Sequence, residues 1–212
     1  MIDKFPSASI AESELQIAGQ MNPGPWVEHS INTGLAARYI AERCNSLDPK
    51  KAYVLGVLHD IGRSVGIVSQ RHMLEGYRYC MKNEWEDVAR VCITHSYLVQ
   101  DVKADVGVWD ISDEDYAFMK LYIETAIYDD YDKLMQLCDS LASAHGFCLL
   151  EKRLVDVHRR YGVNEYTVSR WNAIFEIKEY FENRMGCSIY EVLPNVKETT
   201  LIDSPLWKAP TK

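Results

Sequence analysis

Apolar residues recur at helical spacing along nearly the whole chain, and few segments show the two-residue alternation of a β-strand. Proline and glycine interrupt this pattern where a helix would have to stop, as in Asn22-Pro-Gly-Pro25. Asp48 followed by Pro49 is a strong helix start, because Asp caps well and proline fits the first helical position. The sequence therefore predicts an all-α fold. The expected helices span about residues 9–20, 26–45, 49–61, 69–83, 84–100, 113–127, 128–146, 149–161 and 164–185.

The length of 212 residues suits one large domain or two small ones, and we expect a single domain over 1–212. Hydrophobic residues make up 47% of the chain and charged residues 25%, so the chain can bury a core and fold without a partner. A helical core at about 25–145 would be followed by peripheral helices at about 149–186. We expect the tail, residues 187–212, to pack loosely or to serve a contact.

The net charge of -8 argues against general nucleic-acid binding, which depends on Lys and Arg neutralising phosphates. A small phosphorylated partner stays compatible, because bound metal ions can supply positive charge locally. No apolar run reaches the roughly 18 residues of a membrane span, and Met1-Ile-Asp-Lys-Phe-Pro lacks the blocks of a signal peptide. The six cysteines form no CxxC pair and are expected to be reduced core thiols. We therefore expect a cytoplasmic protein without membrane contact.

Six residues with side chains suited to metal binding are spread over separate helical segments. They are His29, His59, Asp60, His72, His95 and Asp139. Imidazole and carboxylate ligands without thiolate suit Fe, Mn, Zn and similar divalent ions. Six ligands exceed what one tetrahedral structural zinc requires, and they fit a pair of ions about 3.5 to 4 Å apart. Each residue alone would more often be an ordinary core or surface residue, so the prediction rests on the ordered set.

The segments that carry this set resemble the HD-domain superfamily of metal-dependent phosphohydrolases, over roughly residues 25 to 145. The matching segments are Trp26-Val-Glu-His29-Ser, Leu58-His59-Asp60-Ile-Gly-Arg63, Arg71-His72-Met-Leu-Glu-Gly76, Ile93-Thr-His95-Ser and Gln136-Leu-Cys-Asp139-Ser-Leu-Ala. In length and motif order the chain is similar to hydrolases of dinucleoside tetraphosphates within that superfamily. The resemblance implies a helical HD domain with two divalent metal ions, Fe or Mn above all, with Zn, Ni, Co or Mg as alternatives.

The resemblance also implies how the ligands divide. His29, His59, Asp60 and Asp139 would hold one ion, Asp60, His72 and His95 would hold the second, and Asp60 would bridge the two. The implied reaction is hydrolysis of a nucleotide or another small phosphate ester or anhydride by a metal-activated water. The sequence contains no Gly-x-Ser-x-Gly elbow, P-loop or glycine-rich dinucleotide fingerprint that would point to another enzyme class.

Several residues outside this set could contact a substrate. Arg63 follows Asp60 by three residues, where many relatives carry a basic residue, and it could bind a phosphate bidentately. Residues 102–113 have no clear period and are expected to form a loop that shapes the site. In this loop, Lys103 could bind a phosphate and Trp109 could stack on a nucleobase.

Four further polar residues carry weaker or no functional expectation. Arg71 and Lys120 are weaker candidates for substrate contacts than Arg63. His145 and His158 lie outside the motif and are expected to be structural or surface residues.

Two other functions and one assembly state stay open. Some HD proteins with the same six ligands are mixed-valent di-iron oxygenases, and iron retention with oxygen consumption would favour that reaction. A binding module that senses a nucleotide would show tight binding with slow or absent turnover. A homodimer is compatible with the sequence.

Overall fold

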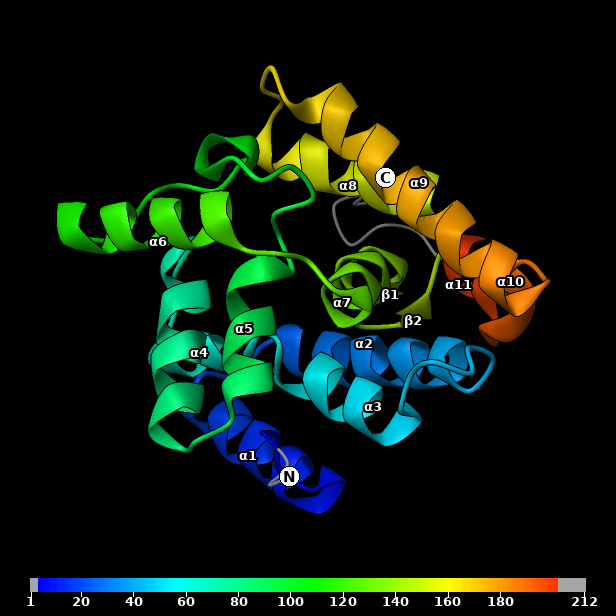
Figure 1. Cartoon of the computed structure of the whole chain (residues 1–212), viewed down its shortest axis with the longest axis horizontal. Helices are drawn as coiled ribbons and strands as arrows, with labels where there is room; N and C mark the ends of the chain where they lie inside the picture. The colour runs from blue at the N-terminus through cyan, green and yellow to red at the C-terminus, as the bar shows by residue number, and fades with distance from the viewer. Residues whose placement is uncertain (1–3, 202–212) are drawn as a thin grey trace, which may run out of the picture.

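The computed structural model describes residues 4–201, and nearly all of its regular structure is helical (Figure 1). The α-helices are α1 (Ala8–Met21), α2 (Trp26–Ala41), α3 (Pro49–Leu58), α4 (Arg71–Lys82), α5 (Glu86–Thr94), α6 (Asp113–Thr125), α7 (Asp130–Leu141), α8 (Leu150–Tyr161), α9 (Thr167–Met185), α10 (Ile189–Val192) and α11 (Val196–Leu201). Two 3-10 helices, η1 (Ile61–Val65) and η2 (Val102–Ala104), and two strands, β1 (Ala142–Ser143) and β2 (Gly146–Phe147), complete the elements. The expected all-α fold is confirmed.

The helix starts and stops follow mostly from capping residues. The Asp48 carboxylate accepts a hydrogen bond from the backbone N–H of Lys50 at 2.8 Å, and α3 begins at Pro49 as predicted. Gly186 closes α9 in a left-handed conformation with φ 71°, which glycine adopts without strain. Helix α1 begins one residue early, because the Ser7 hydroxyl is its N-cap.

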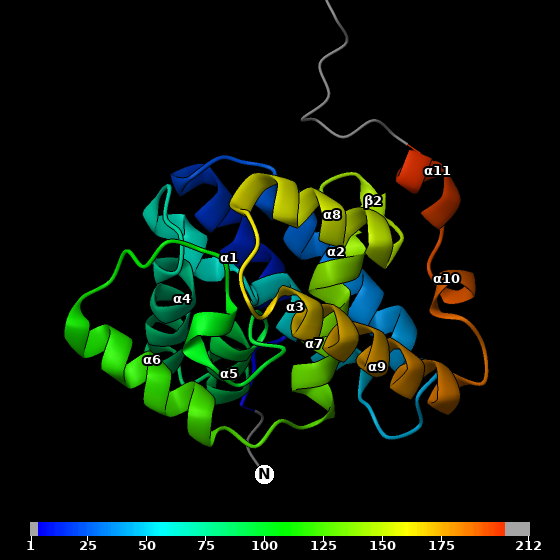
Figure 2. The ribbon, with the colours of Figure 1, turned by 90° about the horizontal axis from the view of Figure 1, so that it is seen from above.

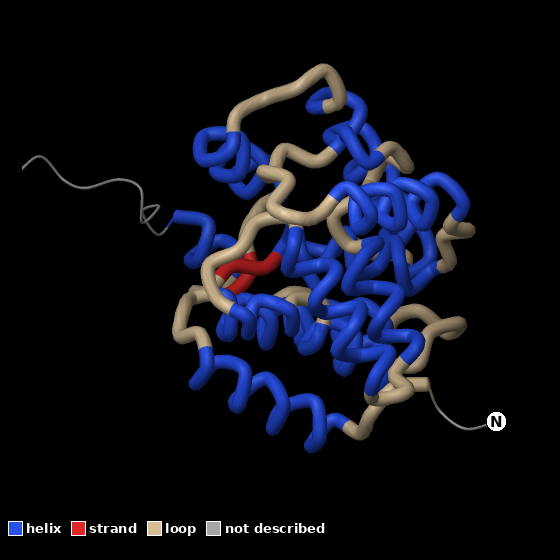
Figure 3. The backbone as a smooth tube through the Cα atoms, turned by 90° about the vertical axis from the view of Figure 1, so that its left-hand side faces the viewer, coloured by secondary structure: helices blue, strands red, loops and turns tan. Residues whose placement is uncertain are grey.

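Several helices end before the predicted boundary, α2 and α7 among them. Helix α2 ends at Ala41, since hydrogen bonds of the i to i+3 type tighten the chain immediately after it. Helix α7 ends at Leu141, and the short strands β1 and β2 follow it (Figure 3). Ala142 pairs with Phe147 across a turn in which Gly146 has a φ of 124°. The prediction of a helix up to residue 146 was wrong because this glycine favours the turn.

Part of the tail that was expected to pack loosely or to serve a contact forms two short helices. Helices α10 and α11 bury Ile189, Leu193 and Val196, which recur at helical spacing and join the main core. The rest of the predicted tail, residues 202–212, lies outside the described residues.

Helices α2 and α3 run side by side and approach each other closely (Figure 1). A Cβ atom on Gly56 would lie 2.6 Å from the Cα atom of Gly34, so neither helix can carry a side chain at this crossing. The close approach brings His29 on α2 near the end of α3. Glycine at both positions therefore places two elements of the candidate site side by side.

The remaining helices surround this pair. Helices α4 and α5 form a second packed pair, α7 passes between the two pairs, and α8 and α9 lie on the side of α7 away from α1 (Figures 1 and 2). The main hydrophobic core includes Leu15, Ile40, Leu55, Leu134 and Phe181. Together with residues of α10 and α11, it joins helices along the whole described chain and fixes the positions of the elements that carry polar residues.

Two further predictions concern membrane spans and the state of the cysteines. Within residues 4–201, no helix is long and apolar enough to cross a bilayer. All six cysteines are free thiols, and each is buried except Cys187, which is half-buried.

Candidate metal centre

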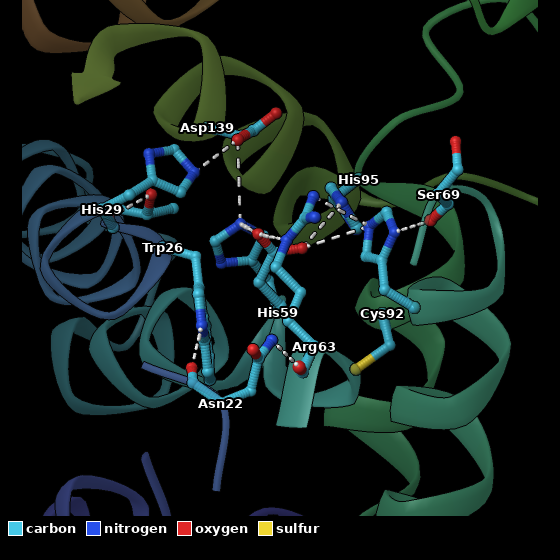
Figure 4. Close-up of polar contacts among 12 residues, drawn as sticks. Asn22, Trp26, His29, His59, Arg63, Ser69, Cys92, His95 and Asp139 are labelled. Carbon is cyan, nitrogen blue, oxygen red and sulfur yellow. Dashed lines mark hydrogen bonds and ion pairs between the residues drawn. The ribbon is translucent and has the colours of Figure 1, made fainter. Parts of the chain in front are cut away.

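The six predicted ligands approach one another from five segments of the fold (Figure 4). His29 lies on α2, His59 and Asp60 follow α3, His72 lies in the first turn of α4, His95 follows α5, and Asp139 lies on α7. All are buried except Asp139, which is half-buried. The structure thus brings together residues that are up to 110 positions apart in the sequence.

One side of the cluster centres on Asp139. Its Oδ1 atom lies 2.8 Å from Nε2 of His29 and 3.7 Å from Nε2 of His59 (Figure 4). The rings of His29 and His59 meet edge to face, with centroids 5.3 Å apart. Ligand atoms of all three residues lie within 4.8 Å of one another, so they could hold one metal ion.

The other side centres on Asp60. Its Oδ1 atom lies 3.2 Å from Nε2 of His72 and 3.8 Å from Nε2 of His95, and its Oδ2 atom lies 3.8 Å from Nε2 of His59. His59, Asp60 and His95 form a second group whose ligand atoms lie within 4.8 Å of one another. Asp60 therefore lies between three imidazoles, in the place that a bridging carboxylate would need.

Backbone carbonyl groups orient three of the histidines. In each of them Nδ1–H donates to the carbonyl oxygen of a residue one turn earlier, which leaves Nε2 facing the cluster. The acceptors are Gly56 for His59 at 2.7 Å, Val91 for His95 at 3.0 Å, and Ser69 for His72. This tautomer presents a nitrogen lone pair to the centre, as histidine ligands of metal ions do.

The protonation states also suit metal binding. Burial lowers the pKa of His29, and burial together with the neighbouring His59 lowers the pKa of His95 to about 4. Burial alone would raise the pKa of Asp139, but hydrogen bonding and charge from His29 and His59 hold it well below the usual range. Burial opposes protonation of His59, yet the carboxylates of Asp60 and Asp139 raise its pKa. Most of the cluster is thus ready to donate electron pairs near neutral pH.

Two buried atoms in the middle of the cluster fit a cation. Nε2 of His59 and Oδ1 of Asp60 have no hydrogen-bond partner among residues 4–201. An unpartnered buried carboxylate oxygen is costly, and a metal ion would offset this cost. The donor set of imidazole and carboxylate therefore fits divalent ions.

Arg63 lies at the edge of this cluster. Its Nε–H donates to Oδ2 of Asp60 at 2.5 Å, and its side chain remains 32% exposed towards the adjoining cavity. Burial would raise the pKa of Asp60, but the charge of Arg63 and of the neighbouring histidines holds it well below the usual range. The side-chain amide of Asn22 donates to the backbone carbonyl groups of Arg63 and Gly66, at 2.6 and 3.0 Å, and fixes the turn. A partly exposed guanidinium group beside the cluster can bind an anion there.

Gly62 has a packing role, and the chain before it is helical over a shorter range than the predicted 49–61. Helix α3 already ends at Leu58, and η1 follows. A Cβ atom on Gly62 would lie 2.0 Å from the carbonyl oxygen of His72 and 2.3 Å from the backbone nitrogen of Gly76. Glycine thus lets η1 approach α4 closely, and this contact brings His72 near Asp60.

Polar side chains on α7 hold the end of α5, which stops at Thr94 rather than at the predicted residue 100. The amide of Gln136 donates to the carbonyl groups of Thr94 and Tyr97 at 3.0 and 3.2 Å, and so satisfies acceptors at the helix end. The Thr94 hydroxyl donates to the fully buried carboxylate of Asp132 at 2.7 Å. Asp132, Gln136 and Asp139 share one face of α7, so the contacts that fix α5 also align it with Asp139.

The loop after α5 is tied to the start of α4. The Asp110 carboxylate accepts hydrogen bonds from the backbone N–H groups of Ser69 and Arg71, both at 2.8 Å. The hydroxyl of Ser69 accepts another from the N–H of Val108, also at 2.8 Å. Because the Ser69 carbonyl orients His72, the loop supports a candidate ligand.

We expect Asp110→Ala to weaken metal binding at the His72 side of the cluster. Loss of a ligand's supporting contacts typically lowers metal affinity by about 10- to 100-fold. Titration of the purified variant with Mn²⁺ measures this change. Asp101→Ala is the matched control, because Asp101 caps η2 in the same way but does not touch α4. Equal Mn²⁺ affinity in the two variants would contradict this role of the loop.

A cavity of about 570 Å³ adjoins the cluster. Arg63, His72 and Asp139 line it together with residues of the 102–113 loop and of helices α8 and α9. Lys103 is exposed and does not line it, and neither does Trp109, which packs edge to face against Tyr116 with ring centroids 4.8 Å apart. The weaker candidates are also paired elsewhere: Arg71 with Glu75 at 3.0 Å, and Lys120 with Glu124 at 3.9 Å.

Several polar residues that line the cavity were not among the predicted site residues, and four of them lie on α8 and α9. They are Arg153 and His158 on α8 and Arg170 and Trp171 on α9. His158 was expected to be structural or on the surface, and the others were not singled out. No motif marks these positions, because their place beside the cluster follows from how α8 and α9 pack.

The fold and the cluster define an all-α protein with a candidate centre for divalent metal ions. The family model of the HD domain matches residues 26–144, more than half of the chain, and the chain belongs to this family. This membership places it in the superfamily of metal-dependent phosphohydrolases. Searches of curated proteins and of solved structures found no match.

Proposed function

We propose that the protein is a dinuclear metal-dependent phosphohydrolase that cleaves a nucleotide or another small phosphate ester or anhydride. The observation that carries this proposal is the convergence of four histidines on Asp60 and Asp139. This cluster adjoins a cavity that is large enough for a small substrate. His29, His59, Asp60 and Asp139 would hold one ion, and Asp60, His72 and His95 the second. Fe or Mn fits this ligand set best.

Metal ions at these positions would lower the pKa of a bound water and offset the charge on phosphoryl oxygens. The chain itself orients the substrate. Arg63 borders both the cluster and the cavity, so it can bind a phosphoryl oxygen while Asp60 keeps it in place. Such fixed positive groups assist phosphoryl transfer because they need no reorganisation during the reaction.

Two features of the chain support the predicted domain organisation and the predicted compartment. The main core contains residues from α1 through α11, which favours one domain over 1–212. Six free thiols suit a reducing compartment such as the cytoplasm.

The test is phosphate release from nucleoside monophosphates, nucleoside triphosphates and dinucleoside polyphosphates, each assayed with added Mn²⁺. We expect turnover by the wild type and metal content near two ions per chain. His29→Ala and His72→Ala should each lower metal content by about one ion, because they lie on opposite sides of the cluster. His145→Ala is the matched control, since His145 is exposed and outside the cluster.

Two results would overturn parts of this proposal. Absence of phosphate release, combined with tightly bound iron and oxygen consumption, would favour an HD oxygenase. Equal metal loss in both histidine variants, from one ion to none, would contradict the dinuclear arrangement but not hydrolysis.

A further inference from the structure

The wall of the cavity contributed by α8 and α9 carries positive and hydrogen-bond-donating groups. Arg153, His158, Arg170 and Trp171 line this wall, which lies beyond the residues matched by the HD family. Asp139 and His72 line the same cavity, so both ends of one small molecule could reach the wall and the metal cluster together.

Donors in this wall lack acceptors. Within residues 4–201, Nε and Nη1 of Arg170 and Nε1 of Trp171 have no hydrogen-bond partner, although all three atoms are buried. The third guanidinium nitrogen of Arg170, Nη2, forms an ion pair with Oδ1 of Asp105 at 3.5 Å. Leaving such donors unpaired is costly, so an acceptor from outside the chain would stabilise the wall.

His158 and Arg153 extend the same wall. Nδ1–H of His158 donates to the carbonyl oxygen of Leu154 at 2.7 Å, and its ring packs edge to face against Trp171. Nε2 of His158 is buried and has no partner among the described residues. The side chain of Arg153 is half-buried and makes no hydrogen bond or ion pair with residues 4–201, and it lines the same cavity as Asp139. A guanidinium group without a partner among these residues therefore shares the cavity with the metal cluster and the rest of the wall.

We propose that Arg153 and Arg170, with His158 and Trp171, form a seat for a second phosphoryl group of the substrate, remote from the one at the metal cluster. This inference rests on the proposed function and narrows its substrate class to small molecules that carry two separate phosphates. A phosphoryl group fits the wall better than a neutral group, because its three outer oxygens can accept from several donors at once. The unpaired charge of Arg153 favours a phosphate, and Arg170, which is also paired with Asp105, adds the donors of a second guanidinium group.

The test compares monophosphates with their bisphosphate counterparts, using the metal-loaded protein. Suitable pairs are adenosine 5′-monophosphate with adenosine 3′,5′-bisphosphate, and fructose 6-phosphate with fructose 1,6-bisphosphate. We expect the wild type to show a kcat/KM at least about tenfold higher for the bisphosphates, as one or two charge-assisted hydrogen bonds would give. Arg153→Gln should reduce this ratio about tenfold or more, mainly through KM.

Arg159→Gln is the matched control, since Arg159 follows His158 on α8 but is exposed and does not line the cavity. Its ratio should equal that of the wild type. Arg170→Gln provides a second variant of the seat. This variant also loses the contact with Asp105, and if it does not fold, Arg153→Gln alone decides the test.

The outcomes separate this inference from the proposed function. Turnover without any preference for bisphosphates, or a preference that persists in Arg153→Gln, would overturn the seat and leave the hydrolase intact. If no phosphate ester is cleaved, the proposed function fails. Calorimetric titration with inorganic phosphate then tests whether the seat binds a phosphate. Phosphate affinity at least tenfold lower in Arg153→Gln than in Arg159→Gln would support the seat, and equal affinity would overturn it.

Discussion

Asp60→Asn is expected to lower the rate of phosphate release by about 10³-fold or more, because bound metal ions contribute several kcal/mol to stabilising the transition state. The substitution keeps the shape of the side chain and removes its charge. Asp60 is 3% exposed and lies within 3.8 Å of Nε2 of His59, His72 and His95. No other carboxylate among the described residues occupies this position between the three imidazoles, so the loss should affect both proposed ions.

Metal content and phosphate release measured on the same preparation test this expectation. Asp113→Asn is the matched control, because it removes one carboxylate charge at an exposed position in the first turn of α6. Circular dichroism shows whether the fold survives. An Asp60→Asn protein that keeps both its metal and its turnover would contradict the bridging role.

The helical pattern of the sequence was enough to predict the fold class and the approximate position of most helices. Capping residues such as Asp48 and Gly186 act locally, so their effect can be predicted without knowing the tertiary structure. Helix ends that depend on distant partners were predicted less well. Helix α5 stops at Thr94, where Gln136 from another helix binds its free carbonyl groups.

The same distinction applies to the candidate site. The set of histidines and aspartates could be predicted because its members differ chemically from an ordinary apolar core and occur in a characteristic order. The α8 and α9 wall could not, because Arg153 and Arg170 resemble surface arginines in the sequence. Lys103 and Trp109 were chosen for their loop, whose path directs one to solvent and the other to Tyr116.

One missed feature did leave a signal in the sequence. Asp132, Gln136 and Asp139 have the spacing i, i+4 and i+7, which places three polar residues on one face of a helix. Asp132 and Gln136 are buried in the structure, and both bind the end of α5. A polar row that leads to a metal-ligand candidate therefore predicts contacts with neighbouring ligand-bearing elements.

Asp132→Ala is expected to lower the free energy of unfolding by about 3 kcal/mol, the range found when one partner of a buried ion pair is removed. The Asp132 carboxylate is fully buried and accepts hydrogen bonds from Nε and Nη2 of Arg90, from the Thr94 hydroxyl and from the backbone N–H of Asp129. Its removal leaves these donors without their acceptor. Because Arg90 is 33% exposed and can regain some hydration, the cost should stay near the lower end of the range.

Chemical denaturation measures this loss. The slope of the unfolding free energy against denaturant concentration should be the same in the variant and the wild type. Asp115→Ala is the matched control, because Asp115 pairs with Arg78 across an exposed contact and should contribute less than about 1 kcal/mol. Similar losses in the two variants would show that burial does not strengthen the Asp132 network. A larger loss in Asp132→Ala together with weaker Mn²⁺ binding would show that the network both stabilises the fold and aligns α5 with α7, since it joins the helices that present His95 and Asp139.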